Sequence, residues 1–233
     1  MLLEFKFKMK KLFIINGINS ELAQHYLKKN IKNNFFIGLN RSKYQGAKSN
    51  NLLLINEFKI NRRIKNILEI YKKIVFINFA ASRDEELIIN LNEKKINNVI
   101  NSNVISSIKI LKKILPFMIK NSYGRIIFLS SKKAESGSKG NILYAFSKVG
   151  LQGVSKTINK EYSRFNISSN IVSLGYFNTR MWKSLKKNTR DNLLKNTLHQ
   201  KLGDPKVLID VINLIIKHHF IIDSKLNIDG GIS

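Results

Sequence analysis

The 233-residue sequence predicts an α/β fold in which one parallel sheet carries helices on both of its faces. Short apolar runs rich in Ile, Val, Leu and Phe recur along the chain, and longer segments with helical spacing of apolar residues separate them. Alternation of strands and helices is typical of a parallel sheet buried on both faces. Hydrophobic residues make up 43% of the chain, which is enough to bury one substantial core.

Seven of the apolar runs have the length of strands, and polar or turn-forming residues bound them. They lie at residues 12–16, 34–39, 51–56, 73–79, 125–130, 168–174 and 225–229. We therefore expect a doubly wound, Rossmann-type sheet of seven parallel strands. Residues 1–233 are expected to form a single domain, since the chain has two prolines, no low-complexity linker and no visible internal repeat.

Three longer segments have the apolar spacing of helices, namely residues 85–120, 141–165 and 207–219. The last of these is amphipathic, so one of its faces is expected to pack on the sheet. His218 and His219 fall in its final turn, where a partly positive side chain suits the helix dipole.

The chain begins with MLLEFKFKMKKLFIING, which mixes Lys with apolar residues and so resembles a signal peptide. Its apolar part is short and no small-residue cleavage site follows, so we interpret LFIIN as the first strand and residues 1–8 as an extension outside the core. No stretch reaches the ~18 uninterrupted apolar residues of a membrane helix. We expect a cytoplasmic protein with no membrane association.

Composition excludes several kinds of site. The chain has no Cys, which removes disulfides, thiolate metal sites and cysteine nucleophiles and is compatible with a reducing compartment. Its four His show no metal-ligand spacing, so no metal is expected. A net charge of +26 raises the question of nucleic acid. Lys is nonetheless spread along the whole chain, so a nucleic-acid partner is not favoured and attraction to anionic substrates is expected.

Candidate acid–base chemistry lies in the run Tyr-Ala-Phe-Ser-Lys. In a helix, Tyr144 and Lys148 lie one turn apart on the same face. The ammonium then favours the phenolate and lowers the pKa of the phenol from its usual value of about 10. Such a pair is suited to proton transfer at a carbonyl group. The alternative is an ordinary pair on a helix surface.

A candidate phosphate-binding turn follows the first predicted strand. Gly17 begins the segment Gly-Ile-Asn-Ser-Glu-Leu-Ala, where a dinucleotide-binding fold places its turn and helix N-terminus. Glu21 and Ala23 stand where glycines are usual, and a carboxylate beside a pyrophosphate is unfavourable unless it points outward or pairs with Arg or Lys. After the second predicted strand comes Arg41 rather than an acidic residue, which favours NADP(H) over NAD(H). The alternative is that Arg41 is only surface charge.

Together with these features, the order and spacing of four polar residues resemble the short-chain dehydrogenase/reductase family over residues 11–233. Ser131 lies 144 − 131 = 13 residues before Tyr144, and Asn103 lies 144 − 103 = 41 residues before it, as in that family. Further segments are similar to family motifs, namely NFAA at 78–81, VINSNV at 99–104, GRIIFLSS at 124–131, LGYFNT at 174–179 and DGG at 229–231. Within the family, the pattern is most similar to 3-oxoacyl-[acyl-carrier-protein] reductases.

The resemblance implies a role for each of the four residues. Tyr144 donates a proton to the carbonyl oxygen, Ser131 holds that oxygen, and Lys148 binds the nicotinamide ribose and lowers the Tyr pKa. Asn103 supports a proton relay through water. The nicotinamide cofactor supplies hydride to the carbonyl carbon.

The resemblance also implies a set of cofactor-binding residues, so the single domain is expected to be a dinucleotide-binding catalytic domain. They are Gly17, Asn19, Ser20, Leu22, Asn40, Arg41, Asn78, Ala80, Tyr144, Lys148, Gly175, Phe177 and Thr179. The chain departs from the family pattern at Phe79, Ala81 and Leu174, which replace Asn, Gly and Pro. These departures lie around the cofactor, so they bear on its affinity more than on catalysis.

A substrate lid is expected at residues 179–190, between the sixth strand and the next helix. Met181 and Trp182 would cover an apolar group there. Four basic residues of the segment would meet an anion, such as phosphopantetheine or a nucleotide sugar; they are Lys183, Lys186, Lys187 and Arg190. The general abundance of Lys explains them equally well.

Three functions remain open. The resemblance implies an NADP(H)-dependent oxidoreductase that interconverts a carbonyl and a secondary alcohol, with a 3-oxoacyl thioester on acyl carrier protein as the first candidate substrate. The first alternative is a reductase of nucleotide-sugar or surface-polysaccharide biosynthesis. The second alternative is a non-catalytic dinucleotide sensor or RNA-binding relative. The family also implies a homo-oligomer, a dimer or tetramer, through the long helices at about 86–120 and 141–165.

Overall fold

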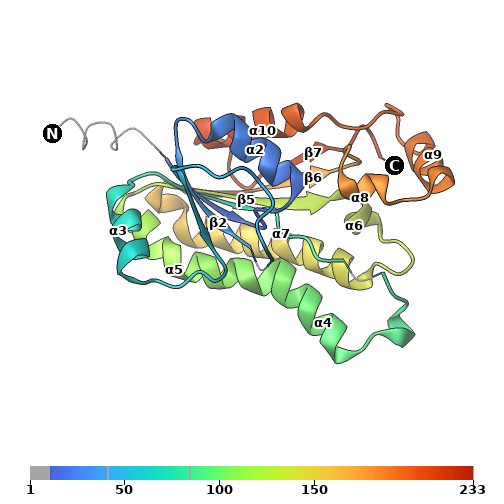
Figure 1. Ribbon diagram of the computed structural model, residues 1–233, viewed down its shortest axis with the longest axis horizontal. Helices are drawn as coiled ribbons and strands as arrows, with labels where there is room; N and C mark the ends of the chain where they lie inside the picture. The colour runs from blue at the N-terminus through green and yellow to red at the C-terminus, as the bar shows by residue number, and fades with distance from the viewer. Residues whose placement is uncertain (1–10, 41, 84, 233) are drawn as a thin grey trace.

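The computed structural model describes residues 11–40, 42–83 and 85–232, and its strands form one parallel sheet. Seven strands lie in the order β3-β2-β1-β4-β5-β6-β7 (Figure 1). Their bounds are β1 Leu12–Asn16, β2 Phe35–Leu39, β3 Leu52–Ile55, β4 Ile74–Asn78, β5 Gly124–Ser131, β6 Ile167–Leu174 and β7 Lys225–Ile228. The predicted Rossmann-type sheet is confirmed, and the ends of each predicted strand differ from the observed ends by at most one residue.

Helices cover both faces of the sheet. α2 and α10 lie on one face, and α3, α5 and α7 lie on the other (Figure 1). The helix bounds are α2 Glu21–Asn30, α3 Arg62–Ile70, α4 Glu93–Ile100, α5 Ser106–Lys120, α6 Lys132–Ser136, α7 Ile142–Tyr162, α8 Arg180–Lys183, α9 Lys187–Lys195 and α10 Pro205–Lys217. The short helices α6, α8 and α9 lie beyond the carboxyl ends of the strands, where open α/β sheets bind their ligands.

Side chains alternate along each strand and so reach the two faces of the sheet in turn. Phe76 and Phe128 pack beneath α5 and α7 and meet edge to face, with ring centroids 6.2 Å apart. On the other face, Phe13, Val75 and Ile127 pack beneath α2 and α10. Because both faces are covered, β1 and β4 are apolar along most of their length rather than alternating with polar residues.

The segment expected to be helical at 85–120 is divided. Ile88–Asn90 forms a separate 3-10 turn, and α4 begins only after Asn92, whose side chain accepts a hydrogen bond from the Lys95 backbone N–H (3.0 Å). Between α4 and α5, Asn101–Ile105 is π-helical, so an extra residue is accommodated within an otherwise continuous helix. The prediction of one helix starting at residue 85 is therefore wrong.

The two other predicted helices end earlier than expected. α7 ends at Tyr162, and a 3-10 turn at Ser163–Phe165 follows it. α10 ends at Lys217, because the next residue, His218, has an extended backbone (φ −106°, ψ 107°). His218 and His219 therefore lie beyond the last turn, and the prediction that placed them inside it is wrong.

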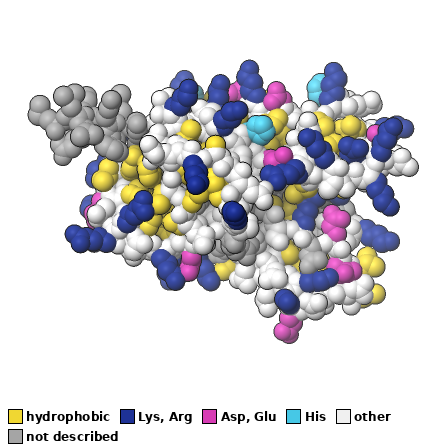
Figure 2. All heavy atoms as spheres, viewed as in Figure 1, with side chains coloured by type: hydrophobic (Ala, Val, Ile, Leu, Met, Phe, Trp, Pro, Cys, Tyr) yellow, Lys and Arg dark blue, Asp and Glu magenta, His cyan; other side chains and the backbone are white. Residues whose placement is uncertain are grey.

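Within the described ranges, no helix is both long and apolar enough to cross a membrane. Figure 2 shows the face of the molecule that is also seen in Figure 1. On this face, Lys and Arg are scattered among few Asp and Glu rather than gathered in one patch. This distribution matches the spread of Lys along the sequence. Residues 1–8, which are expected to form an extension, lie outside the described residues.

We expect Phe76→Ala to lower the free energy of unfolding by about 3–5 kcal/mol, because the substitution removes a buried ring and leaves a cavity that the neighbouring side chains cannot fill. Phe76 is fully buried (0% exposed), and chemical denaturation followed by circular dichroism measures the loss. Phe220→Ala is the matched control. That ring is 92% exposed, so we expect a change within about 0.5 kcal/mol. Equal losses in both variants would contradict this description of the core.

Candidate active site

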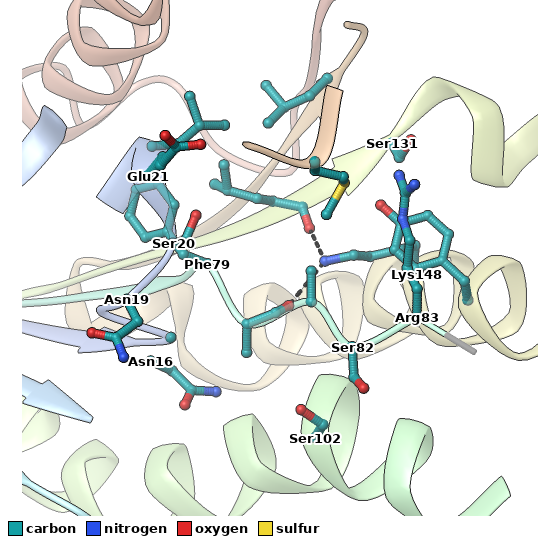
Figure 3. A pocket seen from close by; sticks show the side chains of 18 of the residues that line it. Asn16, Asn19, Ser20, Glu21, Phe79, Ser82, Arg83, Ser102, Ser131 and Lys148 are labelled. Carbon is teal, nitrogen blue, oxygen red and sulfur yellow. Dashed lines mark hydrogen bonds between the residues drawn. The ribbon is translucent and has the colours of Figure 1, made fainter. Parts of the chain in front are cut away.

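A cavity of about 940 Å³ opens at the carboxyl ends of the central strands. It is lined by Asn16 at the end of β1, Ala80 after β4, Ser131 at the end of β5 and Gly175 after β6. Figure 3 shows side chains from β1, from the segment after β4 and from the end of β5 arranged around one space, with Asn16, Ser82 and Ser131 labelled. The strand order reverses between β1 and β4, so the cavity lies where doubly wound sheets bind their ligands.

The turn after β1 brings the backbone close to the cavity. Gly17 has a left-handed conformation (φ +81°), and a Cβ atom there would lie 2.6 Å from the Ala80 backbone N, so only glycine fits. The turn leads to α2, whose capping residue Ser20 makes no side-chain hydrogen bond to the helix. Asn19 and Ser20 both line the cavity. The backbone N–H groups and dipole at this helix start favour an anion such as phosphate.

Lys148 reaches the cavity from α7 and is almost fully buried (2% exposed). Its ammonium donates hydrogen bonds to the carbonyl oxygens of Ala80 (3.1 Å) and Leu129 (2.9 Å), drawn in Figure 3. These carbonyls belong to the exit of β4 and to β5, so one side chain joins three elements. Burial is the main reason why the pKa of Lys148 is lowered, with Tyr144 opposing the shift and the Arg83 charge adding to it.

Tyr144 lies one helical turn before Lys148 and is 6% exposed. Two cations lie near its ring: the Lys148 Nζ is 5.8 Å and the Arg83 guanidinium carbon 4.7 Å from the ring centroid. Burial alone raises the pKa of the phenol. The charge of Lys148, the charge and hydrogen bond of Arg83, and a hydrogen bond with Ser131 outweigh burial, so the net pKa is lowered. The phenol therefore gives up its proton more readily than that of a free tyrosine.

Asn103 is fully buried in the π-helical segment and does not line the cavity. Its side chain accepts a hydrogen bond from the Ser82 backbone N–H (2.6 Å) and donates to the Ser82 carbonyl oxygen (2.9 Å) and the Ser147 hydroxyl (2.9 Å). It therefore ties the loop after β4 to α7. Arg83 follows in that loop, so Asn103 helps to hold the guanidinium beside the Tyr144 ring.

A second amide network lies beneath the cavity. The parallel register pairs Asn16 with Asn78, and the Asn16 Nδ2 donates to the Asn78 Oδ1 (2.9 Å) and the Ser106 hydroxyl (2.9 Å). Asn78 in turn donates to the Asn103 carbonyl oxygen (3.4 Å) and accepts from the Ala80 backbone N–H (3.2 Å). Asn78 therefore supports the loop after β4 from below and is not part of the cavity wall.

Most residues that the resemblance associates with the cofactor line this one cavity. They are Gly17, Asn19, Ser20, Leu22, Asn40, Ala80, Tyr144, Lys148, Gly175, Phe177 and Thr179. Asn78 and Asn103 are buried outside its lining, and Arg41 lies outside the described residues. Among the residues that are described, no group of acidic and His side chains could hold a metal ion.

The carboxylate in the turn after β1 has a partner. Glu21 accepts a hydrogen bond from the Arg180 backbone N–H, and its carboxylate lies 3.6 Å from the Arg180 Nε. Arg180 also donates to the Gln45 side chain (3.0 Å). The pair joins the start of α2 to the start of α8 within the cavity lining, so the carboxylate meets the condition of pairing with Arg.

The segment 179–190 contains α8 and the start of α9. Trp182 is buried against Tyr176, with ring centroids 5.3 Å apart, whereas Met181 is half-exposed; both line the cavity. The four basic residues expected to meet an anion are absent from the lining, namely Lys183, Lys186, Lys187 and Arg190. Arg180 is the cation that this segment contributes instead.

Sequence reasoning misses Arg83, the second cation at the tyrosine. It lies two residues after the motif NFAA, so its position beside a predicted strand end is a signal. In a chain with 41 Lys and Arg residues, however, one more Arg carries little information. Its place over the Tyr144 ring depends on the loop that Asn103 holds, which only the three-dimensional structure describes.

The sequence is similar to those of known proteins. The family model described as short chain dehydrogenase matches residues 15–190. The 3-oxoacyl-[acyl-carrier-protein] reductase of Buchnera aphidicola is 29% identical over 228 residues, which cover 92% of this chain and 92% of that protein. The enzyme of the same name from Chlamydia trachomatis is 30% identical over 177 residues, which cover 75% of this chain and 71% of that protein.

Two solved structures share the fold. ElxO with NADP bound has a TM-score of 0.81 and 22% sequence identity, covering 95% of this chain and 98% of that one. A 4-hydroxyisoleucine dehydrogenase complexed with NADH has a TM-score of 0.78 and 22% identity, covering 96% and 98%. At this identity, the likeness establishes the fold alone.

A doubly wound sheet with a cavity at the point where its strand order reverses is the architecture of a dinucleotide-binding protein. The family model that matches residues 15–190 identifies the family within this class of proteins. The chain belongs to the short-chain dehydrogenase/reductase family and is an oxidoreductase of the carbonyl and alcohol type.

We expect Arg83→Met to raise the pKa of Tyr144, because it removes a charge and a hydrogen bond that both favour the phenolate. A reduction that needs protonated Tyr144 loses activity as pH rises through that pKa. The alkaline limb of the pH profile of kcat/KM is therefore expected to move to higher pH. Arg83→Lys keeps the charge and is the control. An alkaline limb of Arg83→Met at the same pH as that of the wild type would show that Arg83 does not act on the tyrosine.

Proposed function

We propose that this oxidoreductase reduces the 3-oxo group of an acyl thioester with NADP(H), with Tyr144 as general acid. The convergence of Ser131, Tyr144 and Lys148 on one cavity, which also receives the start of α2, is the observation that carries the proposal. Similarity to a 3-oxoacyl-[acyl-carrier-protein] reductase over 92% of the chain supports the substrate class and acyl carrier protein as its carrier.

The residues present fit a dinucleotide. Only glycine fits at Gly17, so the turn before α2 packs directly on the backbone of Ala80 at the cavity, and Ser20 has a hydroxyl that the helix cap does not use. Asn40 would bind at the adenosine end, and Lys148 and Thr179 at the nicotinamide end. When bound, the nicotinamide ring supplies hydride to the carbonyl carbon.

The chain's own residues handle the proton. Tyr144 donates its phenolic proton to the carbonyl oxygen, while the Ser131 hydroxyl donates a hydrogen bond to the same oxygen. Lys148 and Arg83, the two charges that lower the pKa of Tyr144, stabilise the phenolate that remains. The water relay through Asn103 stays a prediction, and its contacts with the loop after β4 support a positioning role as well.

NADP(H) is proposed in preference to NAD(H). Asn40 and Ser42 line the cavity after β2, and Arg41 lies between them in the sequence. NAD sites in this fold use a carboxylate near this position for the ribose hydroxyls, whereas Arg suits a 2′-phosphate. Glu57, which follows β3 and also lines the cavity, is paired with Lys59 (3.0 Å).

A homo-oligomer built through α7 is part of the proposal. Ile142, Phe146 and Val149 lie on this helix with 44%, 64% and 44% of their surface exposed. Gly150 and Gly153 have open space where a side chain would stand. An apolar strip with small residues suits close packing against a second copy of the helix.

We expect Tyr144→Phe to lower kcat on an acetoacetyl thioester by about 10²–10⁴-fold, because it removes the proton donor and keeps the ring. The measurement is the loss of NADPH absorbance with purified protein, and the same assay with NADH tests the cofactor preference. Tyr162→Phe is the matched control on the same helix, since Tyr162 lies outside the cavity lining.

The same assay separates the other candidate functions. Turnover of a keto-sugar nucleotide but not of the thioester would replace the proposed substrate class. Binding of NADPH with no turnover of either compound would favour a non-catalytic dinucleotide sensor. Full activity of Tyr144→Phe would overturn the proposed general acid.

We expect Glu21→Gln to tighten NADPH binding by roughly fivefold, because the substitution leaves the charge of Arg180 unpaired in the cavity lining, and one free positive charge near a phosphate is worth about 1 kcal/mol. Titration followed by nicotinamide fluorescence measures the change. Glu69→Gln on the exposed side of α3 removes the same charge far from the cavity lining and is expected to leave binding unchanged. Weaker binding by Glu21→Gln would mean that its pair with Arg180 organises the site instead of competing with the cofactor.

A further inference from the structure

A second cavity, of about 680 Å³, lies at the amino ends of the strands, at the opposite end of the sheet from the first. The two cavities share no lining residue. Its composition follows from the strand register. Lys11 directly precedes β1, Lys73 directly precedes β4, and Arg125 is the second residue of β5. Alternation carries these side chains to the face covered by α2 and α10. The end of α10 and the segment after it add Lys217 and His219.

Among the residues that the structure describes, the positive charges of this cavity have no acidic partner. None of its lining residues is Asp or Glu, and in the described part of the chain no salt bridge reaches them. Arg125 is 3% exposed, and its guanidinium donates only to neutral oxygens: the Gly124 and Asn166 carbonyls (2.8 Å each) and the Asn166 Oδ1 (3.1 Å). Its buried Nε has no partner among the described residues. Burying a guanidinium without an acidic partner lowers the stability of the folded protein.

The cations also act on one another. Burial lowers the pKa of Lys11, and the charges of Lys73 and Arg125 lower it further. The Tyr123 ring lies near two of them, with its centroid 5.9 Å from the Lys73 Nζ and 4.5 Å from the Arg125 guanidinium carbon. The ring attracts both cations but does not neutralise them. An anion in the cavity would remove the repulsion.

We propose that this second cavity binds a phosphate group, either as free phosphate or as the end of a small phosphate monoester. Arg and Lys are the side chains that proteins use for this anion. The Asn213 amide also lines the cavity; its oxygen accepts from the Tyr26 hydroxyl (3.1 Å), and its NH₂ group donates to none of the described residues. The recessed position of Arg125 suits a small anion rather than the extended backbone of a nucleic acid.

The test uses the full chain in low-salt buffer. Isothermal titration with inorganic phosphate and with glycerol 3-phosphate distinguishes the two sources of the group. We expect the double variant Lys11→Gln/Lys73→Gln to bind phosphate at least about tenfold more weakly than the wild type. Without phosphate, it is expected to melt at the same or a higher temperature, because two charges that repel Arg125 are gone.

The matched control is Lys28→Gln/Lys72→Gln, which removes the same charge from exposed positions outside the cavity. It is expected to bind phosphate as the wild type does. Both double variants are expected to keep wild-type NADPH binding, which separates this cavity from the one at the carboxyl edge. The phosphate titration needs no turnover, so a failure of the proposed reductase activity leaves its outcome unaffected.

Two results would overturn the proposal directly: no binding of phosphate by the wild type, or equal binding by both double variants. Binding of an RNA oligonucleotide without binding of phosphate or its monoester would also overturn it. In that case the charges would form part of a polyanion surface.

Discussion

The cavity at the carboxyl edge of the sheet depends on one buried ammonium. Lys148 loses its hydration inside the protein, and two carbonyl oxygens, of Ala80 and Leu129, replace the water. Because one carbonyl follows β4 and the other belongs to β5, the charge is satisfied only when both strands and α7 hold their native positions. The same ammonium lowers the pKa of Tyr144. The fold and the proton chemistry therefore share a single side chain.

Three amide side chains also hold the loop after β4 in place, together with the Lys148 ammonium. Asn16 and Asn78 meet because the register of β1 and β4 is parallel and in step, and Asn103 reaches both the loop after β4 and α7. Asn78 and Asn103 both donate and accept through their side chains, and Asn16 donates to Asn78. The loop is therefore held without a net charge that would compete with Lys148 or with Arg83 for the phenolate. This arrangement leaves the two cations as the dominant influence on Tyr144 besides burial.

The sequence predicts the sheet well because apolar runs bounded by turn residues are a strong signal. Helix limits are less certain: Ile88 and Ile89 continue the apolar spacing that leads into α4, yet both are exposed and lie before its cap. Tyr144 and Lys148 are predictable because their relation is local to one helix. The contact of Glu21 with Arg180 is not, because 159 positions separate them and the pairing exists only once α2 and α8 have been brought together.

The π-helical segment Asn101–Ile105 bears on how this region tolerates change in length. One extra residue in a helix rotates the part before it by about 100° relative to the part after it. The apolar faces of α4 and α5 are therefore not aligned as they would be in one continuous α-helix. Loss of a single residue here would restore a regular helix, rotate α4 against α5 and carry Asn103 away from its partners on the loop and on α7. Insertions and deletions, more than substitutions, are therefore the mutations that this stretch of chain cannot absorb.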